Sequence, residues 1–237
     1  MIPQMMMPGA AGGSGNGVYN NAYESNVAIN STAYNFGQNT YAITNEFVYA
    51  VVAGHNGATG NMSVNSASLR SFVAFVDAEE AAMTRVVNSA PQLLPTSSPI
   101  AIFRTSTKVT IASRSMYIKG VFSGLVGSAV VMSFTSPHGV IDSTLTAATS
   151  LSLSGTVSKI RGRGLILMAG IGTGTGQTFN PVLDTRKHEY DELLGDQSPI
   201  RFRARVGPSP FLGTTAVALT SSATANATNL VACVLGD

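Results

Sequence analysis

Six basic residues at alternate positions are the first candidates for binding chemistry. Three lie in the run Lys-Ile-Arg-Gly-Arg-Gly, and three lie in Ile-Arg-Phe-Arg-Ala-Arg-Val. They are Lys159, Arg161, Arg163, Arg201, Arg203 and Arg205. Residues two apart in a β-strand point to the same side, so these two runs can present their charges to the phosphates of a nucleic acid. Arginines that are ion-paired or face solvent on a sheet give the same spacing, and both interpretations stay open.

The charge-dense stretch at residues 184–196 is the second candidate site. Its carboxylates are oxygen ligands of the kind that a hard cation such as Ca²⁺ prefers. The candidate ligands are Asp184, Glu189, Asp191 and Glu192. Their spacing does not match an EF-hand loop, and a solvated surface turn explains the same residues. The metal hypothesis is therefore Ca²⁺ shared between subunits, and we expect no other cofactor.

No motif in the chain predicts an enzyme. The glycine-rich run at 169–177 lacks the Lys of a phosphate-binding loop and is followed by a poor helix start, so we interpret it as a wide turn. Cys233 lies within the apolar run Val-Ala-Cys-Val-Leu, which is typical of a core residue rather than a nucleophile. His55 and His138 lie in glycine-containing turns, and no serine lies in a nucleophile elbow.

The composition predicts a folded chain that associates with itself. Of 237 residues, 44% are hydrophobic and only 11% are charged, with a formal net charge of +2. Disorder would require low hydrophobicity and high charge. A surface with so little net charge is poorly protected against self-association. Without a long apolar run or a signal-peptide pattern, we expect no membrane span and no leader, and the single Cys excludes a disulfide framework.

Charge is absent from long parts of the sequence. All 14 basic residues lie between Arg70 and Arg205, and residues 1–69 hold only two acids. Residues 1–17 have the composition of a flexible arm, whereas 18–69 are rich in Asn and aromatic residues. The second segment is suited to an extended path against other protein, or to irregular packing on its own domain. We predict an N-terminal arm over 1–45 and a shell domain over 46–237.

The hydrophobic spacing predicts the elements that position these candidates. Apolar residues from Leu69 to Val87 recur at helical spacing, and Asp77 is a capping acid, which predicts a helix over 77–89. Beyond residue 100 the period becomes two, with eight to ten short strands. Ile200–Val206 alternates best; the other strand candidates include Ser150–Ser154, Thr215–Thr220 and Leu165–Ala169, a continuously apolar run that predicts a buried strand. The predicted fold class is all-β, a β-sandwich or jelly roll with one or two short helices.

Together these features resemble the coat proteins of small icosahedral RNA viruses. The resemblance rests on the Gly/Ala/Asn-rich arm at 1–17, the aromatic and Asn-rich segment after it, the helix expected at 77–89 and the strands through 100–235. It implies an eight-stranded jelly roll whose copies form a shell around the genome. Many such coats carry a basic arm, whereas this arm has no basic residue. The tymovirus-like and picornavirus-like coats look similar in this respect.

The expected function is therefore a viral capsid protein that assembles into an icosahedral shell in the virion. Its expected partners are many copies of itself and a packaged nucleic acid, with RNA favoured, bound without sequence specificity. In the absence of a basic arm, the 159–163 and 201–205 residues, polyamines or metal ions would neutralise the RNA. Two alternatives stay open. One is a phage tail or decoration subunit or a bacterial surface filament, and the other is a secreted β-sandwich carbohydrate-binding module or hydrolase.

Overall fold

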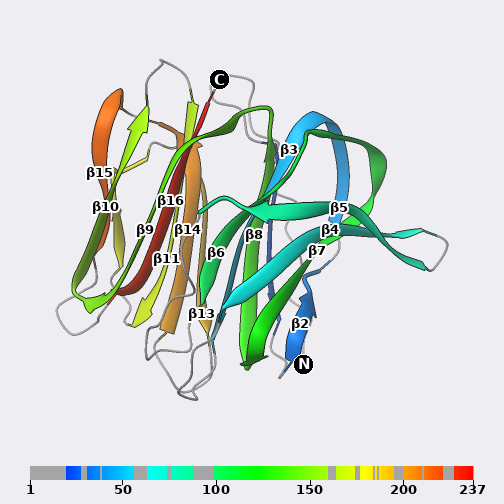
Figure 1. Cartoon of the computed structure of the whole chain (residues 1–237), viewed down its shortest axis with the longest axis horizontal. Helices are drawn as coiled ribbons and strands as arrows, with labels where there is room; N and C mark the ends of the chain where they lie inside the picture. Colours follow the sequence, from blue (N-terminus) through cyan, green and yellow to red (C-terminus); the bar gives the residue numbers. More distant parts are fainter. Residues whose placement is uncertain are drawn as a thin grey trace.

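A computed structural model gives the fold of the chain in three layers of antiparallel β-sheet (Figure 1). The structure describes residues 20–27, 31–37, 39–55, 63–73, 76–87, 99–159, 164–173, 177–183, 185, 187–194, 200–209, 211–220 and 227–236. These residues form sixteen strands and no helix. Accordingly, the described part of the chain has no helix that could span a membrane.

The largest layer, sheet A, has eight strands in the order β1-β8-β3-β6-β5-β4-β7-β2. Their bounds are β1 Asn20–Val27, β2 Ser31–Asn35, β3 Asn39–His55, β4 Val64–Val73, β5 Val76–Arg85, β6 Ile100–Thr105, β7 Val109–Val126 and β8 Ser128–Ser136. A further pairing of β3 with β7 closes β3, β6, β5, β4 and β7 into a ring. One hydrophobic core, which includes Phe36, Leu69, Phe103 and Met116, belongs to this sheet alone.

The ring closes because β3 changes partners along its length. Its first half pairs with β7, and its second half pairs with β6 and β8. The register shifts between Ile43 and Glu46, where Asn45 has a φ of 55°. Asn is one of the few residues that adopts this left-handed conformation readily. The residue type at the bend is therefore suited to the change of direction.

The other two layers are a five-stranded sheet B and a three-stranded sheet C. Sheet B has the order β13-β14-β11-β16-β9, and sheet C has the order β10-β15-β12. Their bounds are β9 Gly139–Ser150, β10 Ser152–Lys159, β11 Gly164–Thr173, β12 Thr178–Asn180, β13 His188–Leu194, β14 Ile200–Pro208, β15 Gly213–Thr220 and β16 Ala227–Gly236. Figure 1 shows β10 and β15 on one flank, the strands of sheet B in the middle, and sheet A on the other side.

Sheet B is covered on both faces, and its central strand β11 shows why its sequence is continuously apolar. Leu165 and Leu167 pack in the core shared with sheet A, while Ile166 and Met168 pack in the core shared with sheet C. Alternate residues of a strand point to opposite faces, so a strand between two layers requires apolar residues at every position. The buried run predicted at 165–169 is confirmed.

The all-β class is confirmed, but the helix predicted over 77–89 is wrong. Residues 76–85 form strand β5, which pairs with β4 on one side and β6 on the other. Leu69 and Met83, which the spacing placed on one helical face, lie on adjacent strands of a hairpin. Backbone hydrogen bonds to two neighbours in the closed ring outweigh the helix preference of Ala, Glu and Met.

The region predicted as an N-terminal arm contributes strands to sheet A. β1 pairs with β8, β2 pairs with β7, and β3 runs through residue 45, where the boundary of the shell domain was placed. Residues 1–19 lie outside the described residues. The division into arm and shell domain, and the role of the arm, stay predictions.

Candidate functional site: an arginine ladder and a hydroxyl face

Two of the three arginines of β14 lie directly opposite carboxylates of β13, and the third, Arg201, lies opposite Leu193. Arg205 pairs in register with Glu189, and Arg203 pairs with Asp191. On the other side of β14, Phe202 belongs to the core between sheets A and B, which fixes the arginines on the opposite side of the strand. The alternation predicted for Ile200–Val206 is thus confirmed. Opposite charges at cross-strand positions stabilise the pairing of the two strands.

Distances show a connected network of ion pairs. Arg205 contacts Glu189 Oε1 through Nε at 2.8 Å and Nη2 at 2.6 Å. Arg203 Nη2 lies 3.0 Å from Asp191 Oδ2, and Arg201 Nε donates to Asp191 Oδ1 at 2.5 Å. Lys187 Nζ lies 3.3 Å from Glu189 Oε2. We call these six residues the arginine ladder: Lys187, Glu189, Asp191, Arg201, Arg203 and Arg205.

The side chains of the ladder are partly buried, which strengthens the attraction between their opposite charges. Side-chain exposure is 23% for Glu189 and 11% for Arg205. Burial alone would raise the pKa of Glu189, but hydrogen bonds and charge from Arg205 and Lys187 outweigh it and lower that pKa. The Arg205 guanidinium also lies 5.5 Å from the centre of the Phe179 ring on β12. The ladder therefore borders the edge of sheet C.

Of the six predicted phosphate-binding residues, the structure brings together the three on β14. Lys159 lies at the end of β10 with 2% exposure, and its Nζ donates to the Ser209 carbonyl at 3.3 Å. Burial lowers the pKa of Lys159. Its ammonium therefore points into the protein and not outward as part of a basic patch. Arg161 and Arg163 lie outside the described residues.

The predicted Ca²⁺ ligands have other partners in this structure. Glu189 and Asp191 bind the arginines of β14, and the Glu192 carboxylate accepts a hydrogen bond from the Tyr190 hydroxyl at 3.2 Å. Asp184 lies outside the described residues. Within the ranges that the structure describes, no group of three His, Cys, Asp or Glu side chains is placed to hold a metal ion. A cation shared between subunits stays a hypothesis.

Sequence reasoning missed a second charged network on β4, β5 and β7. Arg70 Nε donates to Asp77 Oδ1 at 2.6 Å, the Tyr117 hydroxyl donates to the same carboxylate, and Arg114 Nη1 lies 2.8 Å from Glu80 Oε1. Hydrogen bonds from Arg70 and Tyr117 lower the pKa of Asp77. The misassigned helix hid this network, because the acids were taken for a helix cap.

A further polar contact connects sheets A and B. His188 Nε2 on β13 lies 2.5 Å from Glu24 Oε1 on β1. Glu24 belongs to the segment predicted as an arm, and no sequence signal links these two residues 164 positions apart. The pair shows that β1 contacts sheet B as well as its neighbour β8.

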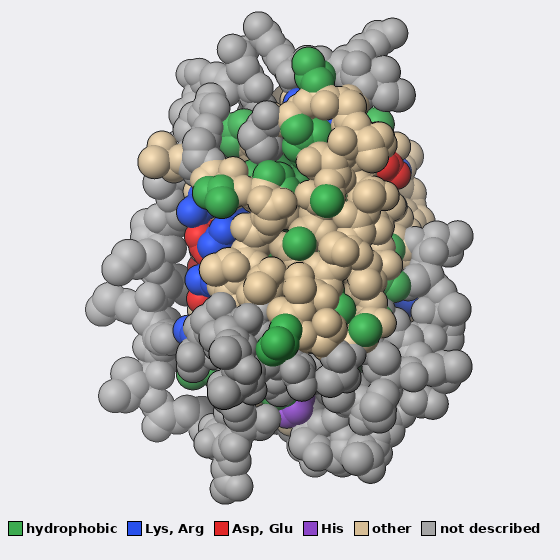
Figure 2. Space-filling model, turned by 90° about the vertical axis from the view of Figure 1, so that its left-hand side faces the viewer, with side chains coloured by type: hydrophobic (Ala, Val, Ile, Leu, Met, Phe, Trp, Pro, Cys, Tyr) green, Lys and Arg blue, Asp and Glu red, His purple; other side chains and the backbone are tan. Residues whose placement is uncertain are grey.

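The outer face of sheet C contrasts with these charged regions, since it has no charged side chain. It consists of small hydroxyl, amide and methyl side chains that alternate with buried apolar ones. We call this surface the hydroxyl face: Ser152, Ser154, Thr156, Ser158, Thr178, Asn180, Thr214, Ala216, Ala218 and Thr220. Lys159 is the only charged residue of β10, β12 and β15, and it is buried. In Figure 2, which looks onto this flank, charged side chains gather at a margin of the face.

The cross-strand register organises the hydroxyl face. Ala216 lies opposite Thr156, and Ala218 lies between Ser154 on β10 and Asn180 on β12. The hydroxyls of Ser158 and Thr214 are 2.8 Å apart, and those of Ser152 and Thr220 are 3.3 Å apart. The sequence predicted the strands near Ser150–Ser154 and Thr215–Thr220, but not that they share one sheet.

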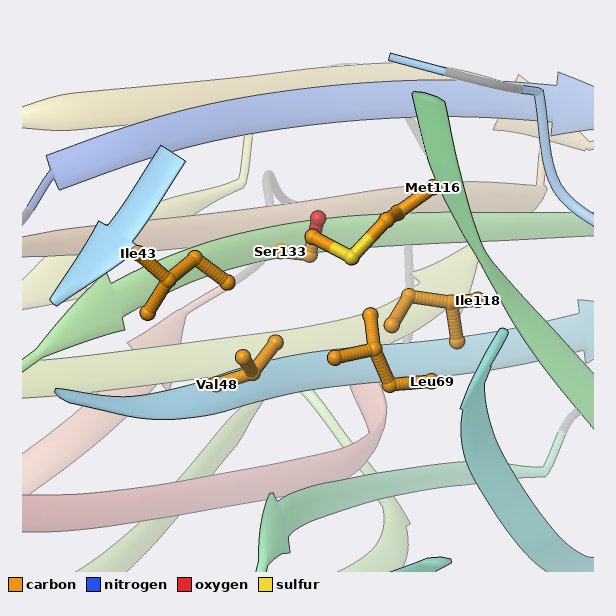
Figure 3. A pocket seen from close by; sticks show the side chains of 6 residues that line it. All are labelled: Ile43, Val48, Leu69, Met116, Ile118 and Ser133. Atoms are coloured by element: carbon orange, nitrogen blue, oxygen red, sulfur yellow. The ribbon is translucent and has the colours of Figure 1, made fainter. Parts of the chain in front are cut away.

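Two buried features offer little chemistry. A small cavity inside sheet A is lined by apolar side chains and a single hydroxyl, that of Ser133, as Figure 3 shows. Its lining residues are Ile43, Val48, Leu69, Met116, Ile118 and Ser133. Cys233 is buried as predicted, and burial raises the pKa of its thiol, so it is protonated and a poor nucleophile.

Comparison with known proteins identifies no relative. No protein-family model, no curated protein and no solved structure matches this chain. The function is therefore inferred from the residues and the geometry of the site.

Proposed function

We propose that this protein is a self-assembling coat subunit whose copies enclose a nucleic acid in a closed shell. The observation that carries this proposal is the hydroxyl face, a set of ten outward residues on three paired strands without one charge. Water leaves such a surface at low cost, because no ion has to be desolvated. Repeated contacts between uncharged faces, closed by symmetry, use this property and limit open-ended aggregation.

The proposal requires only the all-β, layered fold that the subunit has. The jelly-roll connectivity that the viral resemblance implies, and Ca²⁺ at subunit contacts, belong to the proposal as finer features. Three separate cores, one within sheet A and one on each side of sheet B, support a rigid body suited to repeated docking.

Within this proposal, the arginine ladder supplies the contacts to nucleic acid. Two carboxylates face three arginines and Lys187, so the ladder keeps a net positive charge although its members are paired. Such a site binds phosphate weakly and without sequence specificity. We expect Arg203→Gln to reduce the salt dependence of single-stranded RNA binding by about 0.7 in the log–log slope, as for one lost phosphate contact. Filter binding at several salt concentrations measures this, and an unchanged slope excludes Arg203 as a contact.

The proposal is tested on the full chain by light scattering coupled to size-exclusion chromatography, and by negative-stain electron microscopy. We expect closed particles of uniform size at neutral pH and moderate salt, with or without added RNA. A monomer at all protein concentrations, salts and pH values contradicts the proposal. Tubes or filaments would instead support the tail or surface-filament alternative. Monomers that bind a glycan would support the carbohydrate-binding alternative, although the described hydroxyl face has no aromatic ring to stack on a sugar.

A further inference from the structure

We infer that the hydroxyl face docks against the same face of a second copy of this chain. This inference rests on the proposed function and names one of the contacts that a shell would need. The partner is a two-fold related copy, so that each residue of the face meets residues of the same set.

The layout of the face resembles a small protein interface. Its central strand, β15, places Ala216 and Ala218 side by side at the middle of the outer surface. The flanking strands surround them with hydroxyl and amide side chains, of which Thr156 and Asn180 are examples. Interfaces commonly have an apolar centre and a polar rim. Methyl groups at the centre also allow two sheets to approach closely.

The chemistry of the rim favours an identical partner. A Ser or Thr hydroxyl both donates and accepts hydrogen bonds, and so does the amide of Asn180. A face made of such groups is complementary to itself, whereas a face of ammonium or carboxylate groups repels its own copy. The charged arginine ladder borders the face and contributes no residue to it, so docking buries no arginine.

The size of the face places this contact within a larger assembly. At the usual rise and strand spacing, two strands of eight residues and one strand of three cover about 300 Å². Stable two-protein interfaces bury about 800 Å² on each partner. The hydroxyl face is therefore too small to hold an isolated dimer at low concentration, and it stabilises copies that other shell contacts already bring together.

The test introduces charge at the centre of the face. Ala216 is exposed, so Ala216→Lys and Ala216→Glu add a long side chain that reaches solvent without disturbing the core. Each variant alone places like charges on both copies near the two-fold axis. We expect each to assemble at a protein concentration at least about tenfold higher than the unmodified chain. An equimolar mixture of the two variants pairs Lys with Glu, and we expect it to recover assembly.

Matched controls come from strand β5. Ala82→Lys and Ala82→Glu make the same changes at an exposed alanine of sheet A, and we expect them to assemble as the unmodified chain does. Thermal unfolding of every variant checks the fold. If the Ala216 variants unfold, the same pair of substitutions at Thr156, directly opposite, takes their place.

The outcomes separate this inference from the proposed function. If both Ala216 variants assemble normally, the hydroxyl face is not a contact, while the shell proposal stands. If each variant fails and the mixture also fails, the face meets a different surface of its neighbour, and the two-fold inference is wrong. If the unmodified chain never assembles, the proposed function fails first.

Discussion

The hydroxyl face and the arginine ladder are neighbouring parts of the same flank, yet they expose polar groups in opposite ways. The hydroxyl face uses neutral side chains, whose hydrogen bonds with water are replaced readily by hydrogen bonds with protein. The ladder uses full charges that pair across two strands and leave a net positive charge. Desolvating neutral hydroxyls costs much less than desolvating ions.

This difference separates a surface suited to being covered by protein from one whose charges favour a hydrated contact. Covering the hydroxyl face requires no charge to lose its hydration, and covering the ladder requires several to do so. The free energy of unfolding should depend more on the side chains of the ladder than on the outer side chains of the hydroxyl face. The ladder connects β13 to β14 through side chains, whereas the hydroxyl face contributes to the fold mainly through the apolar residues beneath it. The following experiments test that division.

The largest loss of folding stability is expected for a substitution in the core beneath the hydroxyl face. Leu219 is fully buried, and a Cβ placed on Gly170 of sheet B would lie 2.4 Å from its Cδ2, so this leucine packs directly on the sheet B backbone. We expect Leu219→Ala to lower the free energy of unfolding by about 2–5 kcal/mol, because it leaves a cavity between the layers. Urea denaturation measures this. Thr220→Ala, one residue away on the outer side, is the control and should change stability by less than about 0.5 kcal/mol.

The next effect is expected in the ladder. Glu189→Gln removes the charge that faces Arg205 and Lys187, and we expect it to lower the free energy of unfolding by about 1–2 kcal/mol at pH 7. The control is Glu79→Gln, which removes a carboxylate that pairs with Arg70 but is 49% exposed. That pair should contribute at most about 1 kcal/mol. Equal effects of the two substitutions would show that partial burial does not strengthen the ladder.

A pH dependence sharpens the comparison further. Because the pKa of Glu189 is lowered in the folded chain, its stabilising contribution is fully present above the unfolded value of about 4.3 and is lost as pH falls through the folded value. The unmodified chain should therefore lose more stability between pH 5 and pH 2 than Glu189→Gln does, in urea midpoints measured across that range. Parallel pH profiles would contradict the assignment. Asp77, whose pKa is also lowered, contributes equally to both profiles.

Sequence patterns correctly predicted features of this region that depend on a single strand, namely which of its side chains are buried and which are exposed. The alternation in Ile200–Val206 predicted both the buried side and the three aligned arginines. The uniform apolar run in β11 predicted a buried strand, and the structure covers both of its faces. In each case local residue order carries the information, since side chains alternate with a period of two.

Features that depend on pairing between distant segments could not be predicted from the sequence. The pairing of the β13 acids with the β14 arginines could not be predicted, because the register between these strands cannot be read from either strand alone. The hydroxyl face joins β10, β12 and β15, which are separated by long stretches of sequence. The helix predicted over 77–89 failed for the same reason. Residues 76–85 have a helical composition, and only their neighbours in the ring favour a strand.

The smallest effect is expected on the hydroxyl face itself. Ser158→Ala removes the 2.8 Å contact with the Thr214 hydroxyl. Because this contact is exposed, water replaces the lost partner, and we expect the free energy of unfolding of the monomeric, dilute chain to change by less than about 0.5 kcal/mol. Chemical denaturation below the assembly concentration measures this. A loss well above 1 kcal/mol would mean that the hydroxyls serve the fold. A negligible loss means that this hydroxyl contact does not stabilise the fold, as we expect if the face serves the docking contact proposed above.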